Sequence, residues 1–411
     1  MLEFFVRAPY ARQRFRSSPV GSFVEGFATA LREFGYCKRI GVSVLGHAVH
    51  LGVWALRKGR PASALDERAV DAFVAHLPRC RCPGQRASHA AKAGGHARTF
   101  VRYLRTSGIV APIPALPPPS ALVAGFCAWM LRQRGVAETT QHAYGRTAQQ
   151  LVARLGEDPS YYRAAGVRAA VHEVGGGRGV GTAKHAAAVA RALLRYLGVV
   201  GRCQPGLEAS ILPVAHRKDA SLPRYVSAED VQRIVDACDP QRRGGVRDRA
   251  ILLLLARLGL RGGDIVRMRL CDLDWEGARL RVVGKGRREA LLPLAQDVGD
   301  AIGEYLRIRP GIPSDRVFLR TRAPWRPLGG TPTVSAIVAQ AVRRAGVVTP
   351  TCGSNLLRHS LATRLLREGV SLPAIGVVLR HRSIETTAHY AKVDAAMLST
   401  VAQPWIGVGP C

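Results

Sequence analysis

The chain has 411 residues, a hydrophobic content of 47% and a formal net charge of +31. That apolar content excludes a disordered tail protein, and the length allows two or three domains. Because neutralising phosphates releases counterions, a globular chain this basic is expected to bind nucleic acid. The alternatives are a basic ribosomal-type protein or a membrane-surface protein.

The cysteines and the apolar segments indicate a compartment. Nine cysteines, an odd number, are scattered without a regular framework, which predicts a reducing cytosol. The N-terminal residues 1–10 (MLEFFVRAPY) hold too short an apolar run for a signal peptide. The longest apolar stretch, residues 250–256, is far below the ~20 residues of a spanning helix. We expect a cytoplasmic protein with no membrane partner.

Proline and polar residues divide the chain. Residues 111–119 (APIPALPPP) predict a stiff, extended linker. A second break is predicted at residues 216–223 (HRKDASLP), which are polar and end in proline. The predicted blocks are therefore residues 1–110, 120–215 and 222–411, the first two being helical.

The first two blocks resemble each other. Residues 97–104 (ARTFVRYL) and 190–197 (ARALLRYL) end them at an offset of 93. This favours a duplicated small helical domain, and the alternative is coincidence between two basic amphipathic helices. Four side chains of the second block are candidates for phosphate contacts, or else part of an ordinary solvated face: Tyr144, Arg146, Lys184 and Arg191.

The sequence predicts no metal site and no cofactor. Cys80, Cys82, His89 and His96 are candidate zinc ligands by residue type, but C-x-C is not a usual finger spacing and the two histidines are seven residues apart. The glycine-rich residues 174–181 follow no predicted strand, so they indicate a loop and not a nucleotide site.

The third block combines helical and strand patterns. Helices are predicted at about residues 228–238 and 247–259. Residues 280–293 (LRVVGKGRREALLP) alternate around glycines, which predicts a β-hairpin or the edge of a three-stranded sheet. From Pro332 to Tyr390 the pattern is mostly helical. The block is expected to be α+β.

Five polar side chains of this block suit one reaction. Arg261 and Arg358 can each hold phosphate oxygens bidentately. Lys285, between two glycines, can protonate a leaving oxygen, and Tyr390, nine residues after His381, can act as a nucleophile. The set indicates attack on a phosphodiester, with breakage and rejoining of DNA. The alternatives without a catalytic role are a surface arginine, a solvated lysine in a turn and a tyrosine that packs between helices.

Four stretches of the block resemble the catalytic domain of tyrosine recombinases, the phage integrase family. They are residues 256–264 (ARLGLRGGD), 283–294 (VGKGRREALLPL), 355–363 (NLLRHSLAT) and 379–381 (LRH) with the tyrosine that follows. The resemblance implies all-α, SAM-like DNA-binding domains followed by a mixed α+β catalytic domain. It also implies that Asp264 orients Arg261 and that His381 hydrogen-bonds the phosphate.

The chain departs from the family pattern at two positions. Asn355 stands where the family usually has a histidine that can accept the tyrosine proton, and asparagine does not titrate. His359 is predicted to be a structural histidine and not a substitute, because it lies about 100° round the helix from Arg358. Arg380 stands where glycine is common.

The family's reaction proceeds through a 3′-phosphotyrosine and a free 5′-hydroxyl, with neither metal nor ATP. The resemblance implies four protomers on two DNA duplexes, as a homo-tetramer or an assembly with related recombinases. The apolar tail, residues 391–411, would dock into a neighbouring protomer or pack on its own domain. The favoured hypothesis is an integrase or transposase of a mobile element. A DNA-binding subunit without catalysis and a type IB topoisomerase are the alternatives.

Overall fold

The computed structural model describes residues 1–83, 90–113, 119–177, 179–215, 223–284, 289–381 and 383–393. The chain divides into two compact units, Pro114–Ser221 and the combination of Met1–Ile113 with Leu222–Cys411. Each predicted block contains buried hydrophobic clusters of its own. The division into three blocks stays a prediction.

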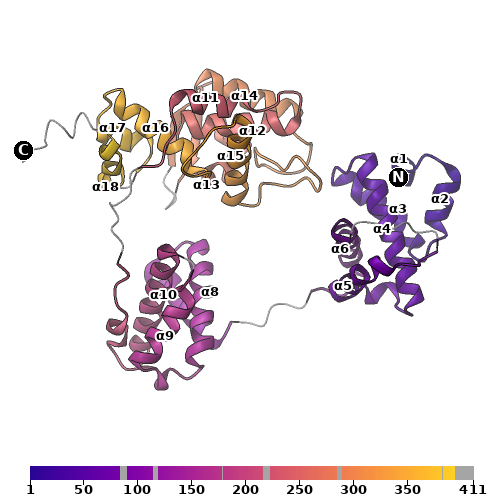
Figure 1. Cartoon of the computed structure of the whole chain (residues 1–411), viewed down its shortest axis with the longest axis horizontal. Helices are drawn as coiled ribbons and strands as arrows, with labels where there is room; N and C mark the ends of the chain where they lie inside the picture. The colour runs from indigo at the N-terminus through magenta and orange to yellow at the C-terminus, as the bar shows by residue number, and fades with distance from the viewer. Residues whose placement is uncertain are drawn as a thin grey trace, which may run out of the picture. The chain divides into compact units, whose positions relative to one another are not determined.

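The described part of the first block is helical (Figure 1). Its elements are α1 (Leu2–Phe5), α2 (Pro9–Arg16), α3 (Gly21–Glu33), α4 (Lys38–Arg57), η1 (Ala62–Ala64), α5 (Glu67–His76), η2 (Leu77–Arg79) and α6 (Ala90–Thr106). Asp66 begins α5 by accepting a hydrogen bond from the backbone N–H of Ala69 at 2.8 Å.

Helix α4 is the central helix of this block. It contacts α3, α5 and α6, and it buries Leu45, Leu51 and Trp54. By length and composition alone α4 could cross a membrane, but 56% of its apolar window is buried inside the structure. Packing against its neighbouring helices therefore accounts for its apolar composition.

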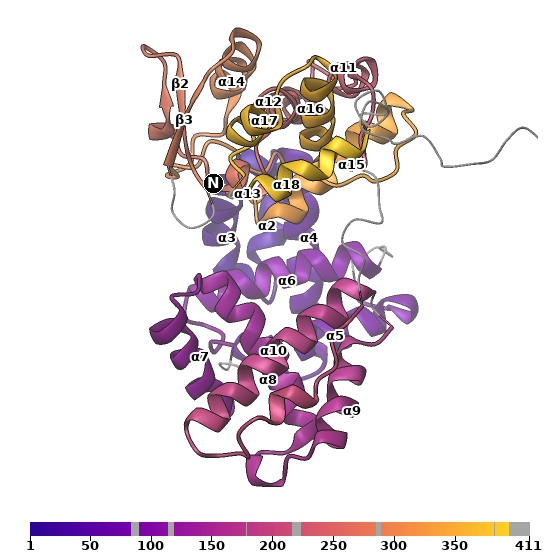
Figure 2. The same ribbon diagram turned by 90° about the vertical axis from the view of Figure 1, so that its left-hand side faces the viewer.

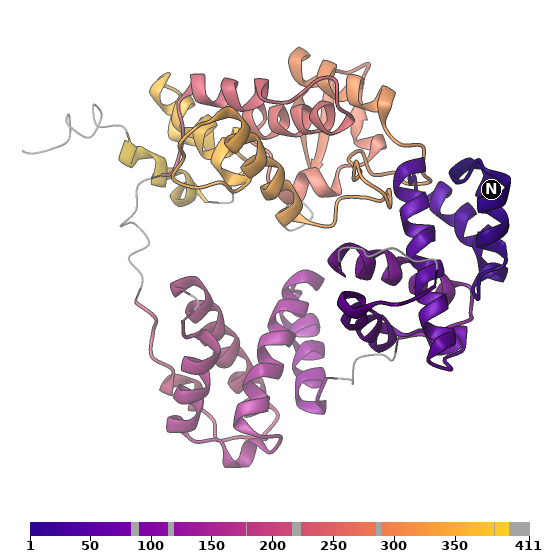
Figure 3. The same cartoon turned by 45° about the vertical axis from the view of Figure 1, so that its right-hand side comes forward.

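The second block is a helical bundle, drawn in magenta in Figure 3. Its elements are α7 (Ala121–Arg134), α8 (Glu138–Leu155), η3 (Pro159–Tyr161), α9 (Ala164–Gly175), α10 (Val180–Val199) and η4 (Leu207–Ser210). Ser120 caps α7 through the backbone N–H of Val123, and Gly135 ends the helix in the left-handed conformation at φ 52°.

The same kind of helix–helix contact occurs inside each of the two helical blocks. In the first, α3 meets α6 where Gly26 faces the hydroxyl of Tyr103. In the second, α7 meets α10 where Gly125 faces the hydroxyl of Tyr196. At both glycines a Cβ atom would overlap that hydroxyl, so the helix needs glycine there for the same reason. The duplication itself stays a prediction.

The third block is α+β, as the sequence predicts. Its helical elements are α11 (Ala228–Asp236), α12 (Arg243–Arg257), α13 (Gly262–Arg267), η5 (Leu270–Asp272), α14 (Gln296–Ile308), α15 (Thr331–Ala345), α16 (Asn355–Arg367), α17 (Leu372–Val378), α18 (Ile384–Ala388) and η6 (His389–Val393). The strands β1 (Leu273–Asp274), β2 (Arg279–Val283) and β3 (Glu289–Pro293) form an antiparallel sheet in the order β1-β2-β3; β2 and β3 are labelled in Figure 2. The predicted hairpin is thereby confirmed, with β1 as a third strand.

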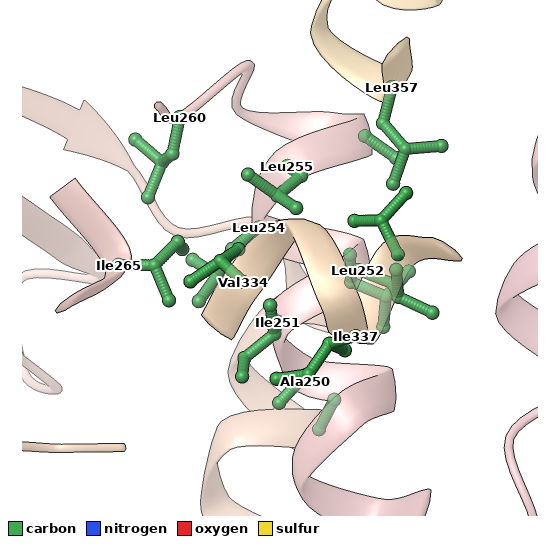
Figure 4. Close-up of a cluster of buried hydrophobic side chains, with 14 of the residues drawn as sticks. Ala250, Ile251, Leu252, Leu254, Leu255, Leu260, Ile265, Val334, Ile337 and Leu357 are labelled. Carbon is green, nitrogen blue, oxygen red and sulfur yellow. The ribbon is translucent and has the colours of Figure 1, made fainter. Parts of the chain in front are cut away.

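The apolar run at residues 250–256 forms the middle of α12. All seven of its side chains are buried, because α12 contacts α11, α14, α15 and α16 on different sides. Figure 4 shows Ile251, Leu254 and Leu255 among side chains from the neighbouring elements, such as Val334 of α15. Each buried leucine or isoleucine contributes about 1.5–3 kcal/mol by leaving water. This core fixes the elements that carry Arg261 and Arg358.

A second, smaller cluster lies at the end of the block. Leu361 and Leu366 of α16 pack with Ile375 of α17, Leu379 and Tyr390. This cluster fixes η6 against α16 and so determines where the tyrosine side chain points.

Candidate active site

Tyr390 lies in η6, and only 2% of the residue is exposed. Its hydroxyl oxygen is 2.7 Å from Nδ1 of His359. Burial raises the pKa of Tyr390, while the nearby charges of Arg358 and Arg261 act in the opposite direction. Because the phenol is buried and protonated, it needs a proton acceptor before it can attack phosphorus.

His359, predicted from the sequence to be a structural histidine, contacts the hydroxyl of Tyr390. The sequence comparison with the family places Asn355, and not His359, at the position of the usual family histidine. His359 follows Asn355 by four residues on α16, so the two lie on the same face of the helix. Asn355 itself is exposed at the first turn. His359 therefore offers the tyrosine a ring nitrogen from one turn further along.

Arg261 is positioned by the start of α13. Gly259, at φ 56°, turns the chain after α12, and Arg261 is the residue that precedes α13. The backbone N–H of Arg261 donates to the Asp264 carboxylate at 3.0 Å, and its guanidinium Nη2 donates to the carbonyl oxygen of Arg380 at 3.2 Å. Asp264 thus holds the backbone of Arg261 at the start of α13.

Arg358 is 4% exposed and projects from α16. Its two terminal nitrogens donate to the carbonyl oxygens of Gly259 and Leu379. Burial, and then the charges of Arg261 and Arg380, lowers the pKa of Arg358. The lowered pKa of about 9 still leaves Arg358 protonated at neutral pH. The cost of holding these cations together is relieved when an anion binds between them.

Arg380 is a site residue that the sequence analysis noted only as a departure. It adopts φ 54°, a left-handed conformation that explains why glycine is common there. Its Nη2 pairs with Asp264 at 3.0 Å, and Asp264 also pairs with Arg267 at 3.1 Å. Nε and Nη1 of Arg380 are buried and, within the described residues, have no hydrogen-bond partner. The sequence feature that could have identified Arg380 as a site residue is a charged side chain at a position where glycine is common.

His381 completes the cluster. Its Nδ1 is 2.8 Å from the hydroxyl oxygen of Thr387, which is fully buried. Its ring lies nearly parallel to that of Tyr390, with centroids 6.3 Å apart and an interplanar angle of 4°. Burial, and then the charges of Arg358 and Arg261, lowers the pKa of His381 to about 4. In the free protein the imidazole is therefore neutral at physiological pH.

The structure brings Arg261, Arg358, His381 and Tyr390 together, with Asp264 and His359 beside them. Lys285 lies outside the described residues, between strands β2 and β3. The tail beyond residue 393 also lies outside them.

The candidates of the second block occupy two helices. Arg146 of α8 and Lys184 of α10 are exposed. The Tyr144 ring meets His185 edge-on, with centroids 5.4 Å apart. Arg191 is bound within its own block, where Nη2 donates to the carbonyl oxygens of Ile211 and Leu212 at 3.0 and 3.1 Å.

The sequence relationships agree with this geometry. The sequence profile of the phage integrase family matches residues 224–397. The protein named "Putative integrase/recombinase y4rA", from Sinorhizobium fredii, is 34% identical over 418 residues, which cover 99% of each chain. The chain belongs to the phage integrase family of tyrosine recombinases. The tyrosine recombinase XerC of Staphylococcus carnosus is 30% identical over 186 residues, covering 45% of this chain and 62% of XerC.

Solved structures of the family share the fold. The XerH site-specific recombinase bound to its palindromic difH substrate matches with a TM-score of 0.53 and 16% identity, covering 83% of this chain and 95% of XerH. A lambda integrase dimer bound to a core site matches with a TM-score of 0.52 and 16% identity, covering 70% of this chain and 98% of the lambda integrase chain. At these identities the matches show the fold alone.

Proposed function

We propose that the protein is a site-specific DNA recombinase, an integrase or transposase of a mobile element, which cleaves and rejoins DNA through a 3′-phosphotyrosine. One observation carries the proposal: the Tyr390 hydroxyl is hydrogen-bonded to His359 beside the guanidinium groups of Arg261 and Arg358. A nucleophile, a proton acceptor and two phosphate-binding cations occupy one site. The family relationship supports the same reaction class.

The charges of the site favour a phosphodiester as the substrate. The cations of Arg261, Arg358 and Arg380 lie close enough to disfavour one another, and the carboxylate of Asp264 offsets part of this charge. A phosphate between the guanidinium groups would accept hydrogen bonds from both arginines. Its negative charge would also raise the low pKa of the site histidines towards the range useful for proton transfer.

The proposed reaction conserves the number of bonds. The Tyr390 oxygen attacks phosphorus as its proton passes to His359, and the bond between phosphorus and the 5′ oxygen breaks. Lys285 would donate the proton that the leaving 5′ oxygen takes up. In the reverse direction a 5′-hydroxyl from a partner strand attacks the phosphotyrosine and releases the tyrosine. The phosphotyrosine stores the energy of the broken bond, so rejoining needs no ATP.

Double-stranded DNA is the proposed partner. In related solved structures the recombinase is bound to DNA, among them XerH on difH and lambda integrase on a core site. In this chain Tyr144, Arg146 and Lys184 are proposed to face DNA phosphates, while Arg191 holds the segment that leaves the second block. A homo-tetramer on two duplexes, or an assembly with related recombinases, is the proposed working form. A cytoplasmic location follows from this substrate.

The test is covalent capture. The full chain and its Tyr390→Phe variant are incubated with nicked suicide substrates carrying the ends of the element, and a denaturing gel is run. We expect an adduct with the wild type alone. Wild-type protein that shifts the DNA without forming an adduct would favour an accessory DNA-binding subunit. Relaxation of supercoiled DNA without a preferred site would favour a type IB topoisomerase.

A further inference from the structure

Four potential metal ligands meet in the N-terminal block, far in sequence from the recombinase motifs. They are His50 of α4, His76 at the end of α5, and Cys80 and Cys82 just after η2. Their ligand atoms all lie within 4.8 Å of one another. In the sequence, His89 and His96 are the histidines that follow the same cysteines. His96 instead lies against His47, with 3.1 Å between their Nδ1 atoms, and His89 lies outside the described residues.

We propose that His50, His76, Cys80 and Cys82 bind one Zn²⁺ ion at a structural site. Two thiolates and two imidazoles form a ligand set that zinc prefers in tetrahedral geometry. Zn–S bonds of about 2.3 Å and Zn–N bonds of about 2.0–2.1 Å place neighbouring ligand atoms roughly 3.3–3.8 Å apart. Nε2 of His50 is 3.2 Å from Sγ of Cys80, and Nε2 of His76 is 3.5 Å from Sγ of Cys82.

The surroundings of the cluster prepare the ligands. Nδ1 of His76 is 2.9 Å from the carbonyl oxygen of Phe73, which can only accept a hydrogen bond. The ring proton is therefore on Nδ1, and the lone pair of Nε2 faces Cys82. The backbone N–H of Cys82 points at Sγ of Cys80 at 3.4 Å, as amides commonly do around a metal-bound thiolate. Arg57 lies 4.0 Å from Sγ of Cys82, and its charge opposes the rise in the pKa of Cys82 that burial and the neighbouring Cys80 cause.

Burial and net charge also suit a bound ion. His50 is 2% exposed and Cys82 is 7% exposed, whereas His76 and Cys80 are half-buried. Two thiolates cancel the charge of Zn²⁺, so the occupied site is neutral and compatible with a partly apolar environment. The ion would join α4, the end of α5 and the segment after η2. It would thereby fix a segment that lies outside regular secondary structure.

The C-x-C spacing argued against a zinc finger because a finger takes all four ligands from one short segment. Here the helical bundle supplies His50 from 30 residues before Cys80. Only the packing of α4 against α5 brings that histidine to the cysteines. The proposal does not depend on the recombinase function, because none of the four ligands belongs to the candidate active site.

The test uses the full chain, produced in zinc-supplemented medium and purified under reducing conditions without chelators. Elemental analysis is expected to find about one zinc per chain, as for a single four-ligand site. The Cys80→Ser/Cys82→Ser double variant and His50→Asn should lose at least nine-tenths of it. Two matched variants, Cys37→Ser and His96→Asn, change the same residue types in the same block outside the cluster, and should keep it.

A second readout does not depend on the variants folding. Protein freed of zinc by a chelator is titrated with Co²⁺, and a tetrahedral thiolate site gives intense visible absorption bands. We expect those bands in the wild type and in both matched variants. Wild-type protein that is helical by circular dichroism but carries no zinc and gives no such bands would overturn the proposal. Full zinc retention in Cys80→Ser/Cys82→Ser would overturn it as well.

Discussion

Replacing His359 should slow strand cleavage while leaving DNA binding intact. The structure places Nδ1 of His359 2.7 Å from the Tyr390 hydroxyl, and burial, followed by the charge of Arg358, lowers the pKa of His359 to about 4. The imidazole is therefore neutral and able to accept a proton. Asparagine places an oxygen near the position of Nδ1 and can keep the hydrogen bond, but it cannot take up the proton. Alanine removes both capabilities.

The expected magnitudes follow from these two contributions. Proton transfer by a positioned side chain contributes typically 10²–10⁴-fold to a rate. The hydrogen bond itself contributes about 1 kcal/mol, which corresponds to roughly fivefold. We therefore expect His359→Asn to slow cleavage about 10²-fold, and His359→Ala to slow it several times further. Both variants should bind DNA as the wild type does, because the hydrogen bond of His359 is made to the tyrosine hydroxyl and no positive charge is lost.

The assay is a single-turnover measurement of covalent adduct on a nicked suicide substrate with the protein in excess. His389→Asn is the matched control, because the His389 ring also contacts Tyr390, with centroids 6.1 Å apart, and within the described residues makes no hydrogen bond to the tyrosine oxygen. The His389→Asn variant should form the adduct within about threefold of the wild-type rate, because no proton transfer is lost. Cleavage by His359→Ala at the wild-type rate would refute the assignment of the proton acceptor.

Three further predictions concern the arginines, the helical packing and the charge. Arg261→Lys and Arg358→Lys should abolish adduct formation on the denaturing gel, because the point charge of lysine cannot replace the two-pronged hydrogen bonding of a guanidinium group. The mobility shift of the DNA should stay largely intact, and a variant that still forms the adduct would contradict this prediction. Gly125→Ala should destabilise the second block by about 1–3 kcal/mol in denaturant unfolding, since its methyl group overlaps the hydroxyl of Tyr196. Adding Tyr196→Phe should restore most of the loss, and no rescue would argue against the overlap. DNA affinity should fall steeply as the salt concentration rises. A binding constant that stays flat in a log–log plot against salt concentration would mean that the charge of +31 serves another purpose.

Much of the site could be predicted from the sequence because its chemistry needs particular residue types. Two arginines and a late tyrosine leave few reactions to consider, and their order and spacing carried the family resemblance. The α+β class of the third block followed from local patterns, since the hairpin around residues 280–293 depends on alternation and glycines within one segment.

The tertiary structure decided which side chains meet. His359 and Tyr390 are 31 residues apart, and their hydrogen bond depends on how η6 packs against α16. Likewise, His50 reaches Cys80 only because α4 packs against α5. Local sequence patterns report periodicity and turn chemistry within one segment, whereas contacts between distant segments depend on how whole helices pack. The sequence therefore specified the reactive residue types, and the packing of the helices selected their partners.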